Sequence, residues 1–363
     1  MNSYYATVFG AGISGLSLAN ALRKKGKKVL VIDPNVSDEA PGPPAGLVNP
    51  AMGRHARLSW ESEACYISLK EHLDEMIKET GASDIISDSG VIRPAINEKL
   101  AANFKDSLEN YQWPDGWISW LSEDEITKKV SAISKNFGGL YLNCGITVFV
   151  DRYLNTYRKY LQKNDVTIQY VPGRYEWDEA KKHFEIYHEG KHLGTSEYVI
   201  VAAGSYTPEF SDWDIAPIHL VKGQIIVYES KEVLPWDIAI SAMGYALRRG
   251  DHELVVGSTY EHKFDNRDIT GEAAKQIDKK LANMLSGVVD NVEPLRQMAG
   301  VRVTTPNKLP YIGRHPQNAQ LCIYTGLGSK GLLFSEYVAK LLTNHLVEGT
   351  EIADELDVKR DLN

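Results

Sequence analysis

The sequence has few cysteines, no long apolar run and no excess of positive charge. Cys65, Cys144 and Cys322 are far apart and odd in number, which fits a reducing compartment and offers no metal-binding spacing. No apolar run approaches the roughly 20 residues needed to cross a bilayer. A formal net charge of −8 argues against nucleic acid as an obligatory partner. We therefore expect a cytoplasmic protein with no membrane span and no bound metal.

The sequence also lacks the residue groups of hydrolytic and metal-dependent catalysis. Its ten histidines are scattered, and no Ser-His-Asp, Cys-His or metal-ligand constellation is evident. This absence is compatible with a reaction in which an organic cofactor carries the chemistry and the protein supplies orientation and charge.

A glycine-rich turn stands near the start of the chain. From position 8, VFGAGISGLSLANALRKKGKKVLVIDP reads as a strand, three glycines, an amphipathic helix and a second strand ending at Asp33. Gly10 permits the tight turn, Gly12 lets the backbone approach a pyrophosphate, and Gly15 lets the helix pack closely on the strand. The helix N-terminus favours phosphate, and the Asp33 carboxylate can accept hydrogen bonds from ribose hydroxyls. This context predicts a dinucleotide site; the alternative is a glycine-rich turn without a ligand.

The alternation of strands and helices does not continue as in an NAD dehydrogenase. An irregular, Pro- and Gly-rich loop is expected over 34–54, followed by a helix at about 61–80. The nucleotide fold resumes with helix and strand in VDRYLNTYRKYLQKNDVTIQYV and a strand in EYVIVAAGSYTP. Three β-rich runs between 216 and 262 suit an antiparallel sheet, and 270–287 reads as a helix capped by Thr270. At 363 residues, two interwoven domains are expected.

Five segments in order carry a family resemblance: the opening turn, AGLVNP at 45–50, VIVAAGSYTP at 199–208, GVRVTTPNKLPYIG at 300–313 and TGLGSKGLLFSEYVAKLL at 325–342. Together they resemble the D-amino-acid oxidase superfamily of FAD-dependent oxidoreductases. The resemblance is strongest to its glycine oxidase and sarcosine oxidase branch and to the flavin domain of the bacterial tRNA methylaminomethyl-uridine enzyme. It implies FAD and an α/β fold. A discontinuous Rossmann-like FAD-binding domain (1–84, 146–215 and 300–363) would join an antiparallel β-rich substrate domain (85–145 and 216–299).

The resemblance also assigns residues to the cofactor. Loop 45–47 would lie against the isoalloxazine, and the helix after TGLGSKG would favour negative charge at the flavin N1–C2=O edge. Without the resemblance, these segments would be a surface loop and an ordinary capped helix. Sarcosine oxidase relatives attach flavin through a cysteine that QMAGVRVTTPN lacks, so FAD is expected to be non-covalent. The implied cofactor residues are Gly10, Gly12, Ile13, Ser14, Gly15, Asp33, Pro34, Ala45, Gly46, Leu47, Val171, Gly204, Gly326, Leu327, Gly328, Ser329, Lys330, Gly331 and Leu332.

Two residues are implied at the substrate. Arg302 matches the family arginine that clamps a substrate carboxylate, a role for which a planar guanidinium is well suited. Tyr245 matches the tyrosine that borders the substrate in the antiparallel sheet. The alternatives are a structural arginine and a packing tyrosine. Two departures leave the substrate open: Ser329 and Lys330 stand where the glycine oxidase loop has an arginine, and Met243–Gly244 replaces a histidine.

The implied reaction is oxidation of a C–N bond. A small amino acid or N-substituted amino acid would pass a hydride to flavin N5, and the resulting imine would hydrolyse. Oxygen or another electron acceptor would then reoxidise the flavin. Two alternatives stay open: a flavin enzyme of tRNA wobble-uridine modification, and a flavin-containing binding protein without turnover.

Overall fold

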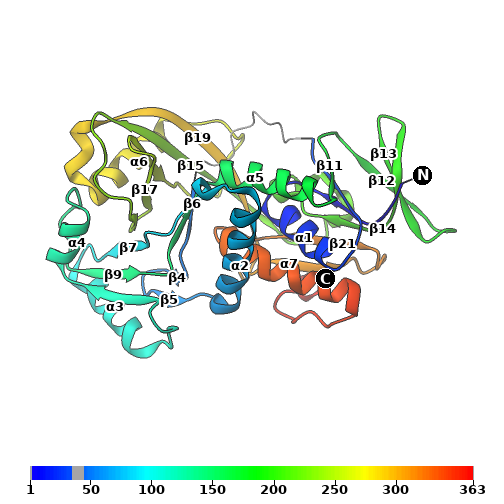
Figure 1. Cartoon of the computed structure of the whole chain (residues 1–363), viewed down its shortest axis with the longest axis horizontal. Helices are drawn as coiled ribbons and strands as arrows, with labels where there is room; N and C mark the ends of the chain where they lie inside the picture. The colour runs from blue at the N-terminus through cyan, green and yellow to red at the C-terminus, as the bar shows by residue number, and fades with distance from the viewer. Residues whose placement is uncertain (1, 35–44, 363) are drawn as a thin grey trace.

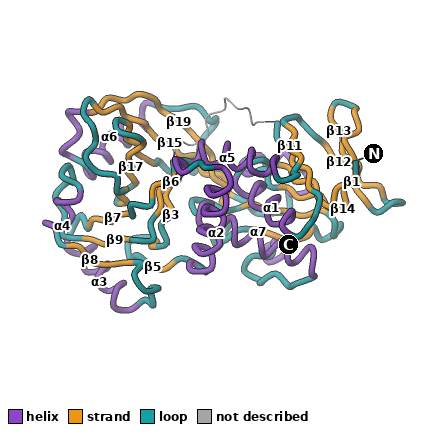
Figure 2. The backbone as a smooth tube through the Cα atoms, viewed as in Figure 1, coloured by secondary structure: helices purple, strands orange, loops and turns teal. Residues whose placement is uncertain are grey.

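The computed structural model describes residues 2–34 and 45–362, and its two largest sheets occupy opposite ends of the molecule (Figure 1). Helices lie mainly in the half that holds the Rossmann-like sheet and between the two sheets (Figure 2). The helices are α1 (Ile13–Lys24), α2 (Ser62–Thr80), α3 (Glu98–Asn110), α4 (Glu123–Lys129), α5 (Val150–Lys163), α6 (Gly271–Met284) and α7 (Gly331–Glu348).

The Rossmann-like sheet is parallel through its centre, in the order β11-β2-β1-β14, with β21 beside the end of β14. Continuous apolar runs explain this, because a parallel strand is buried on both faces. Helices α1, α2, α5 and α7 share one core with it, in which α2 packs against α5 and α7. Its strands are β1 (Ser3–Phe9), β2 (Val29–Ile32), β11 (Thr167–Gln169), β12 (Arg174–Asp178), β13 (His183–His188), β14 (Lys191–Val201), β20 (Tyr311–Arg314) and β21 (Leu321–Thr325).

The second sheet is antiparallel except for the pair β16 and β7, in the order β19-β15-β18-β17-β16-β7-β9-β8. Its strands are β7 (Val91–Pro94), β8 (Ile118–Leu121), β9 (Gly139–Leu142), β15 (His219–Ser230), β16 (Ala239–Ser241), β17 (Tyr245–Arg249), β18 (Glu253–Gly257) and β19 (Val292–Thr304). The expected antiparallel sheet between 216 and 262 is confirmed. So is the Thr270 cap, whose hydroxyl accepts the Ala273 N–H. The expected domain boundaries stay a prediction.

The two faces of this antiparallel sheet have different neighbours. One face packs on α6, and the core there includes Ile226, Ile277 and Leu281. The other face packs toward the segment around Ala45 and Leu47. Side chains alternate between faces along a strand, so only every second residue can reach a site on that second face.

Two expectations need correction, and one hairpin was not expected. The segment expected to be an irregular loop over 34–54 contains two short strands, β3 (Gly46–Val48) and β4 (Ala51–Met52), whose backbones pair with β10 (Ile146–Val148) and β5 (Arg57–Leu58). Residues 35–44 of that loop lie outside the described residues. The strand expected through Val171 ends at Gln169. Nothing in the pattern predicted the hairpin of β12 and β13, which extends the Rossmann-like sheet antiparallel to β14.

Candidate functional site

The glycine turn has the geometry that a pyrophosphate requires. Gly10 has φ +119° and packs against Ala202, where a Cβ would lie 2.3 Å from the carbonyl oxygen. A Cβ on Gly15 would lie 1.9 Å from the Gly10 oxygen. At Gly12, by contrast, a Cβ would have no protein atom within 4 Å, and this residue begins α1 without a side-chain cap. Open space in front of uncapped N–H groups fits a phosphate, with Ile13 and Ser14 in the first turn.

Asp33 lies beside this turn, directly after β2. One of its carboxylate oxygens accepts the Ala11 N–H at 2.7 Å. The bond fixes the carboxylate at the edge of the turn, where the sequence predicted a ribose-binding acid. Pro34 follows it, and Val171 lies just beyond β11, whose Gln169 carbonyl accepts the Asp33 N–H at 3.0 Å. The predicted adenosine-side residues are therefore neighbours in space.

The second glycine-rich loop, 326–331, meets the antiparallel sheet. Gly326 and Gly328 have φ values of +78° and +55°, conformations that favour glycine. The Gly328 N–H donates to the Val303 carbonyl at 2.8 Å, which ties the loop to β19 beside Arg302. α7 then begins at Gly331 without a side-chain cap. A Cβ on Gly46 would lie 2.7 Å from Leu332, so β3 runs directly along the start of α7.

Arg302 and Tyr245 lie on one face of the antiparallel sheet. Across the sheet, Tyr245 pairs with Gly257, Gly257 pairs with Ile225, and Ile225 pairs with Met298. Met298 precedes Arg302 on β19 by four residues, an even number, so both side chains lie on the face of Tyr245. The Arg302 guanidinium lies over the neighbouring strand β15, because a Cβ on Gly223 of that strand would lie 2.3 Å from its Nη1. Burial raises the pKa of Tyr245 to about 12, although the Arg302 charge opposes this shift.

Among the described residues, the contacts of Arg302 are to uncharged groups. Its Nη2 donates to Ser258 Oγ at 2.7 Å, its Nη1 approaches the Thr259 carbonyl at 3.5 Å, and its Cζ lies 4.9 Å from the Tyr260 ring centroid. Lys280, from α6, donates to the Met243 and Ser258 carbonyls at 2.9 and 2.8 Å. We name Arg302, Tyr245, Ser258, Tyr260 and Lys280 the Arg302 group.

Ser329 and Lys330, the loop residues expected at the place of the family arginine, have different surroundings. Ser329 is exposed, whereas Lys330 is half-buried and donates to the Asn49 carbonyl at 3.3 Å. Burial lowers the pKa of Lys330 to about 8, and the charge of Arg93 contributes. Arg93 itself is buried and donates to the carbonyls of Ala51 and Gly53 at 2.8 and 2.6 Å. Lys330 thus holds the segment after β3.

Most of the predicted site residues therefore converge at the junction of the two sheets. Gly204 begins the short 3-10 helix η2 (Gly204–Glu209), which packs against β19. The sequence analysis missed Ser258 and Tyr260, which lie in the loop after β18, and Lys280, which lies on α6. Serine, tyrosine and lysine in such positions carry no local motif, so only their contacts single them out. Ser258 and Tyr260 contact the Arg302 guanidinium, and Lys280 donates to the Ser258 carbonyl.

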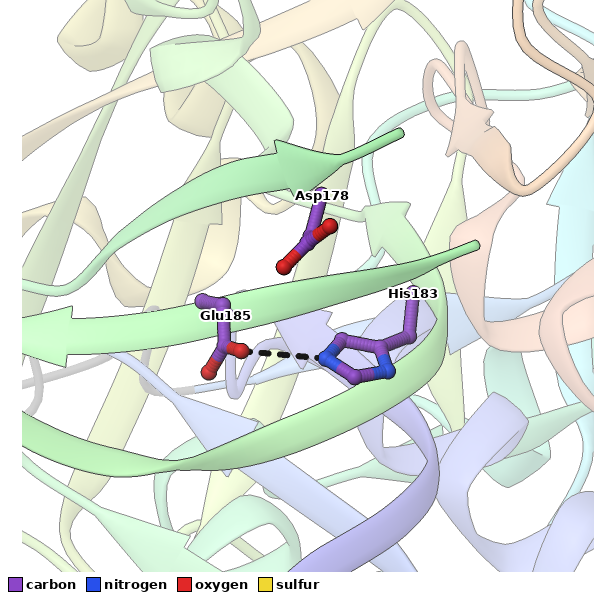
Figure 3. Close-up of side chains that lie close together, drawn as sticks. All are labelled: Asp178, His183 and Glu185. Atoms are coloured by element: carbon purple, nitrogen blue, oxygen red, sulfur yellow. Dashed lines mark hydrogen bonds and ion pairs between the residues drawn. The ribbon is translucent and has the colours of Figure 1, made fainter. Parts of the chain in front are cut away.

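A separate group of metal-binding residue types lies on the hairpin of β12 and β13, at the far end of the molecule. Asp178, His183 and Glu185 have potential ligand atoms within 4.8 Å of one another (Figure 3). The Lys181 ammonium, however, lies 3.0 Å from Asp178 and 3.1 Å from Glu185. His183 Nε2 and Glu185 Oε1 are 3.0 Å apart. These contacts form an ion-pair network in which the Lys181 ammonium bridges the two carboxylates.

Among the described helices, none is both long enough and apolar enough to cross a membrane.

Several curated proteins resemble this chain. Glycine oxidase of Bacillus subtilis (strain 168) is 24% identical, covering 94% of this chain and 92% of its own length. Glycine oxidase of Pseudomonas aeruginosa is 31% identical over 160 residues, 42% of each chain. A tRNA 5-methylaminomethyl-2-thiouridine biosynthesis bifunctional protein of Paraburkholderia phytofirmans is 20% identical over 99% of this chain. The chain spans only 59% of that protein's length.

Solved structures share the fold. Glycine oxidase from Geobacillus kaustophilus superposes with a TM-score of 0.82 at 18% identity, covering 100% of this chain and 99% of its own. L-proline dehydrogenase from P. horikoshii has the same TM-score at 14% identity, covering 99% and 98%. The profile described as DAO, FAD dependent oxidoreductase, matches residues 6–345. The chain therefore belongs to this family of FAD-dependent oxidoreductases.

Proposed function

We propose that this protein oxidises the C–N bond of a small amino acid or N-substituted amino acid, and that Arg302 holds the substrate carboxylate. The supporting observation is the set of Arg302 contacts. Within residues 2–34 and 45–362, the guanidinium makes no ion pair, although it is half-buried. A half-buried guanidinium with only neutral partners is suited to an anionic ligand.

The neighbours of Arg302 support a substrate site beside the flavin. Tyr245 shares its face of the sheet, and the glycine-rich loop is hydrogen-bonded to the adjacent Val303. The start of α7 and loop 45–47 enclose the same junction. In this arrangement Arg302 orients the substrate, Tyr245 borders it, and the apolar residues around Ala45 and Leu47 exclude water.

FAD would be held without a covalent bond. The first turn of α1 and Gly12 would hold the pyrophosphate, Asp33 the ribose, and the segments 45–47 and 326–332 the isoalloxazine. When bound, FAD would accept a hydride from the substrate carbon at N5, leaving an imine that water hydrolyses. All three cysteines are buried, and none lies in the segment before Thr305 where relatives attach flavin. Acid precipitation should release the yellow colour into the supernatant; colour retained in the pellet would contradict this.

A second candidate is oxidation of an aminomethyl-uridine in tRNA. It is favoured by the match to the tRNA-modifying bifunctional protein, which extends over 99% of this chain. The acidic net charge of −8 weighs against it. A gel shift with unmodified and modified tRNA at moderate salt separates the two, because a free amino acid oxidase should show no shift.

The experiment that tests the proposed function is an anaerobic titration of the purified yellow protein. D-amino acids, N-methyl amino acids and cyclic amino acids are added in turn while flavin absorbance is followed. We expect at least one carboxylate-bearing amine to bleach the flavin, and its decarboxylated analogue to do so poorly. Equal bleaching by both members of such a pair would remove the role of Arg302. No bleaching by any of them would favour the second candidate or a flavin protein without turnover.

A further inference from the structure

Two cations contact Ser258, the residue that directly follows β18. Arg302 donates to the Ser258 side chain at 2.7 Å, and Lys280 donates to the Ser258 carbonyl at 2.8 Å. They arrive from different elements, β19 and α6. The pKa of Lys280 is lowered, first by burial and second by the positive charge of Arg302.

Neither cation forms an ion pair with a residue that the structure describes. In the described part of the chain, no carboxylate lies within the 4.0 Å ion-pair distance of Arg302 or Lys280. Glu261, three residues after Ser258, already has partners within the protein. Its Oε1 accepts from Gln224 and Thr259, each at 2.8 Å, and its Oε2 lies 3.7 Å from the buried Lys222. Asp278, on the same helix as Lys280, accepts the Tyr228 hydroxyl at 2.6 Å instead.

Two like charges in a half-buried site repel each other, and the fold does not relieve this repulsion with an acid. One carboxylate satisfies Arg302, since its planar fork binds a carboxylate with two parallel hydrogen bonds. Lys280 has three N–H donors, of which two are used by the Met243 and Ser258 carbonyls. The third donor and the charge remain for a second acidic group.

We propose that the substrate carries two acidic groups, one bound by Arg302 and the other by Lys280, and is therefore an amino acid with a second carboxylate on its side chain or on its amine nitrogen. This inference rests on the proposed function, because it places a second anchor at the same site. Lys280 is the residue that determines specificity for the second charge.

The test uses holoprotein and non-oxidisable probes. Acetate and propionate carry one carboxylate, and malonate and succinate carry two; each is titrated while the flavin spectrum is followed at low ionic strength. The wild-type protein should bind the better dicarboxylate about tenfold more tightly than the better monocarboxylate. Lys280→Met should lose this preference while its acetate affinity stays within about threefold of wild type. Lys280→Arg should keep most of the preference for dicarboxylates. Lys279→Met, on the exposed side of the same helix, is the matched control and should behave as wild type.

The possible outcomes separate this inference from the proposed function. If wild-type protein binds both classes equally, the dicarboxylate inference is wrong and the amino acid function stands. If Lys280→Met and Lys280→Arg weaken all four probes equally, Lys280 only supports the fold at Met243 and Ser258, and the inference is again wrong. If no carboxylate perturbs the wild-type flavin, both proposals are contradicted.

Discussion

The Glu336 carboxylate and the Arg302 guanidinium both lie inside the protein, but their surroundings differ. Glu336, on α7, is 4% exposed and accepts hydrogen bonds from Ser17 of α1 at 2.7 Å and Tyr157 of α5 at 3.0 Å. His72 of α2 places its Nε2 3.7 Å away. We name Ser17, His72, Tyr157 and Glu336 the Glu336 cluster. It links four helices through one carboxylate, whereas the Arg302 group collects two cations and no acid among the described residues.

This difference distinguishes a structural polar group from a ligand-binding one. A buried carboxylate with hydroxyl donors from two helices stabilises the packing of those helices. It joins α1 and α7, the two helices whose N-termini are expected to face FAD. Half-buried cations without a counter-charge instead lower the stability of the ligand-free protein. Such local instability is typical of a ligand-binding site. Substitutions in the two places should therefore have opposite consequences for stability and binding.

The largest stability effect is expected from Glu336→Leu. The substitution leaves the buried hydroxyls of Ser17 and Tyr157 without their acceptor, so the free energy of unfolding should fall by about 2–5 kcal/mol. Glu336→Gln keeps an amide oxygen and should lose about 1 kcal/mol. Glu348→Leu, at the exposed end of the same helix, is the control, and removing its surface ion pair with Lys25 should change stability by less than about 1 kcal/mol. Urea denaturation of the apoprotein measures all three. Equal losses for Glu336→Leu and Glu348→Leu would break the comparison.

A pH effect is expected next, from His72. Burial is the main cause that lowers its pKa in the folded protein, and Glu336 opposes it only in part. The unfolded chain therefore binds a proton near the ordinary pKa of about 6.5, whereas the folded chain binds it only at lower pH, so stability falls as pH decreases below that value. Between pH 7 and pH 5 the loss should be at most about 2 kcal/mol. His72→Gln should flatten this dependence, and His55→Gln, at an exposed histidine, should not. A slope that is the same in all three proteins would show that His72 does not titrate in this way.

A smaller effect on stability is expected from Arg302→Met. The variant removes a charge that has only neutral partners and keeps most of the side-chain volume. Its free energy of unfolding should stay within about 1 kcal/mol of wild type, or rise, because repulsion with Lys280 disappears. Thermal unfolding of the apoprotein measures this. A loss of 3 kcal/mol or more would make Arg302 a structural residue like Glu336.

The smallest effect is expected from Tyr245→Phe. No hydrogen bond to the Tyr245 hydroxyl is found among the described residues, so the apoprotein should unfold within about 0.5 kcal/mol of wild type. If the hydroxyl contacts the substrate, carboxylate affinity should fall by about two- to tenfold. Isothermal titration with the best carboxylate ligand checks this, and an unchanged affinity would leave Tyr245 a packing residue.

The sequence predicted the Rossmann-like half of the fold well because local rules dominate there. Gly10 and Gly15 have no room for a side chain, and the apolar runs of β1 and β2 predict buried strands. The strand β19 was not predicted, because Pro294 and Gly300 interrupt the segment and its polar and apolar residues do not alternate over most of its length. Its 13 residues become a strand by pairing with β15, a contact that no local pattern contains.

Only those residues of the site that belong to a sequence motif could be predicted. Arg302 and the two glycine-rich loops were found through ordered segments of the sequence. Lys280 and Ser258 were not, because α6 brings the lysine to the end of β18 through tertiary packing alone. The ionic partners of a charge are likewise set by the fold. The absence of an acid near Arg302, among the described residues, therefore could be found only in the structure.

The central claim is that Arg302 binds the substrate carboxylate, and it is tested most directly by the kinetics of Arg302→Ala and Arg302→Lys on the best amino acid substrate. FAD affinity and the flavin spectrum should be nearly unchanged in both. For Arg302→Ala, kcat/KM should fall about 30- to 5000-fold, the equivalent of about 2–5 kcal/mol for a charge-assisted contact in an enclosed site. Arg302→Lys should recover only part of the loss, since an ammonium lacks the planar fork. Unaltered turnover in Arg302→Ala would contradict the account.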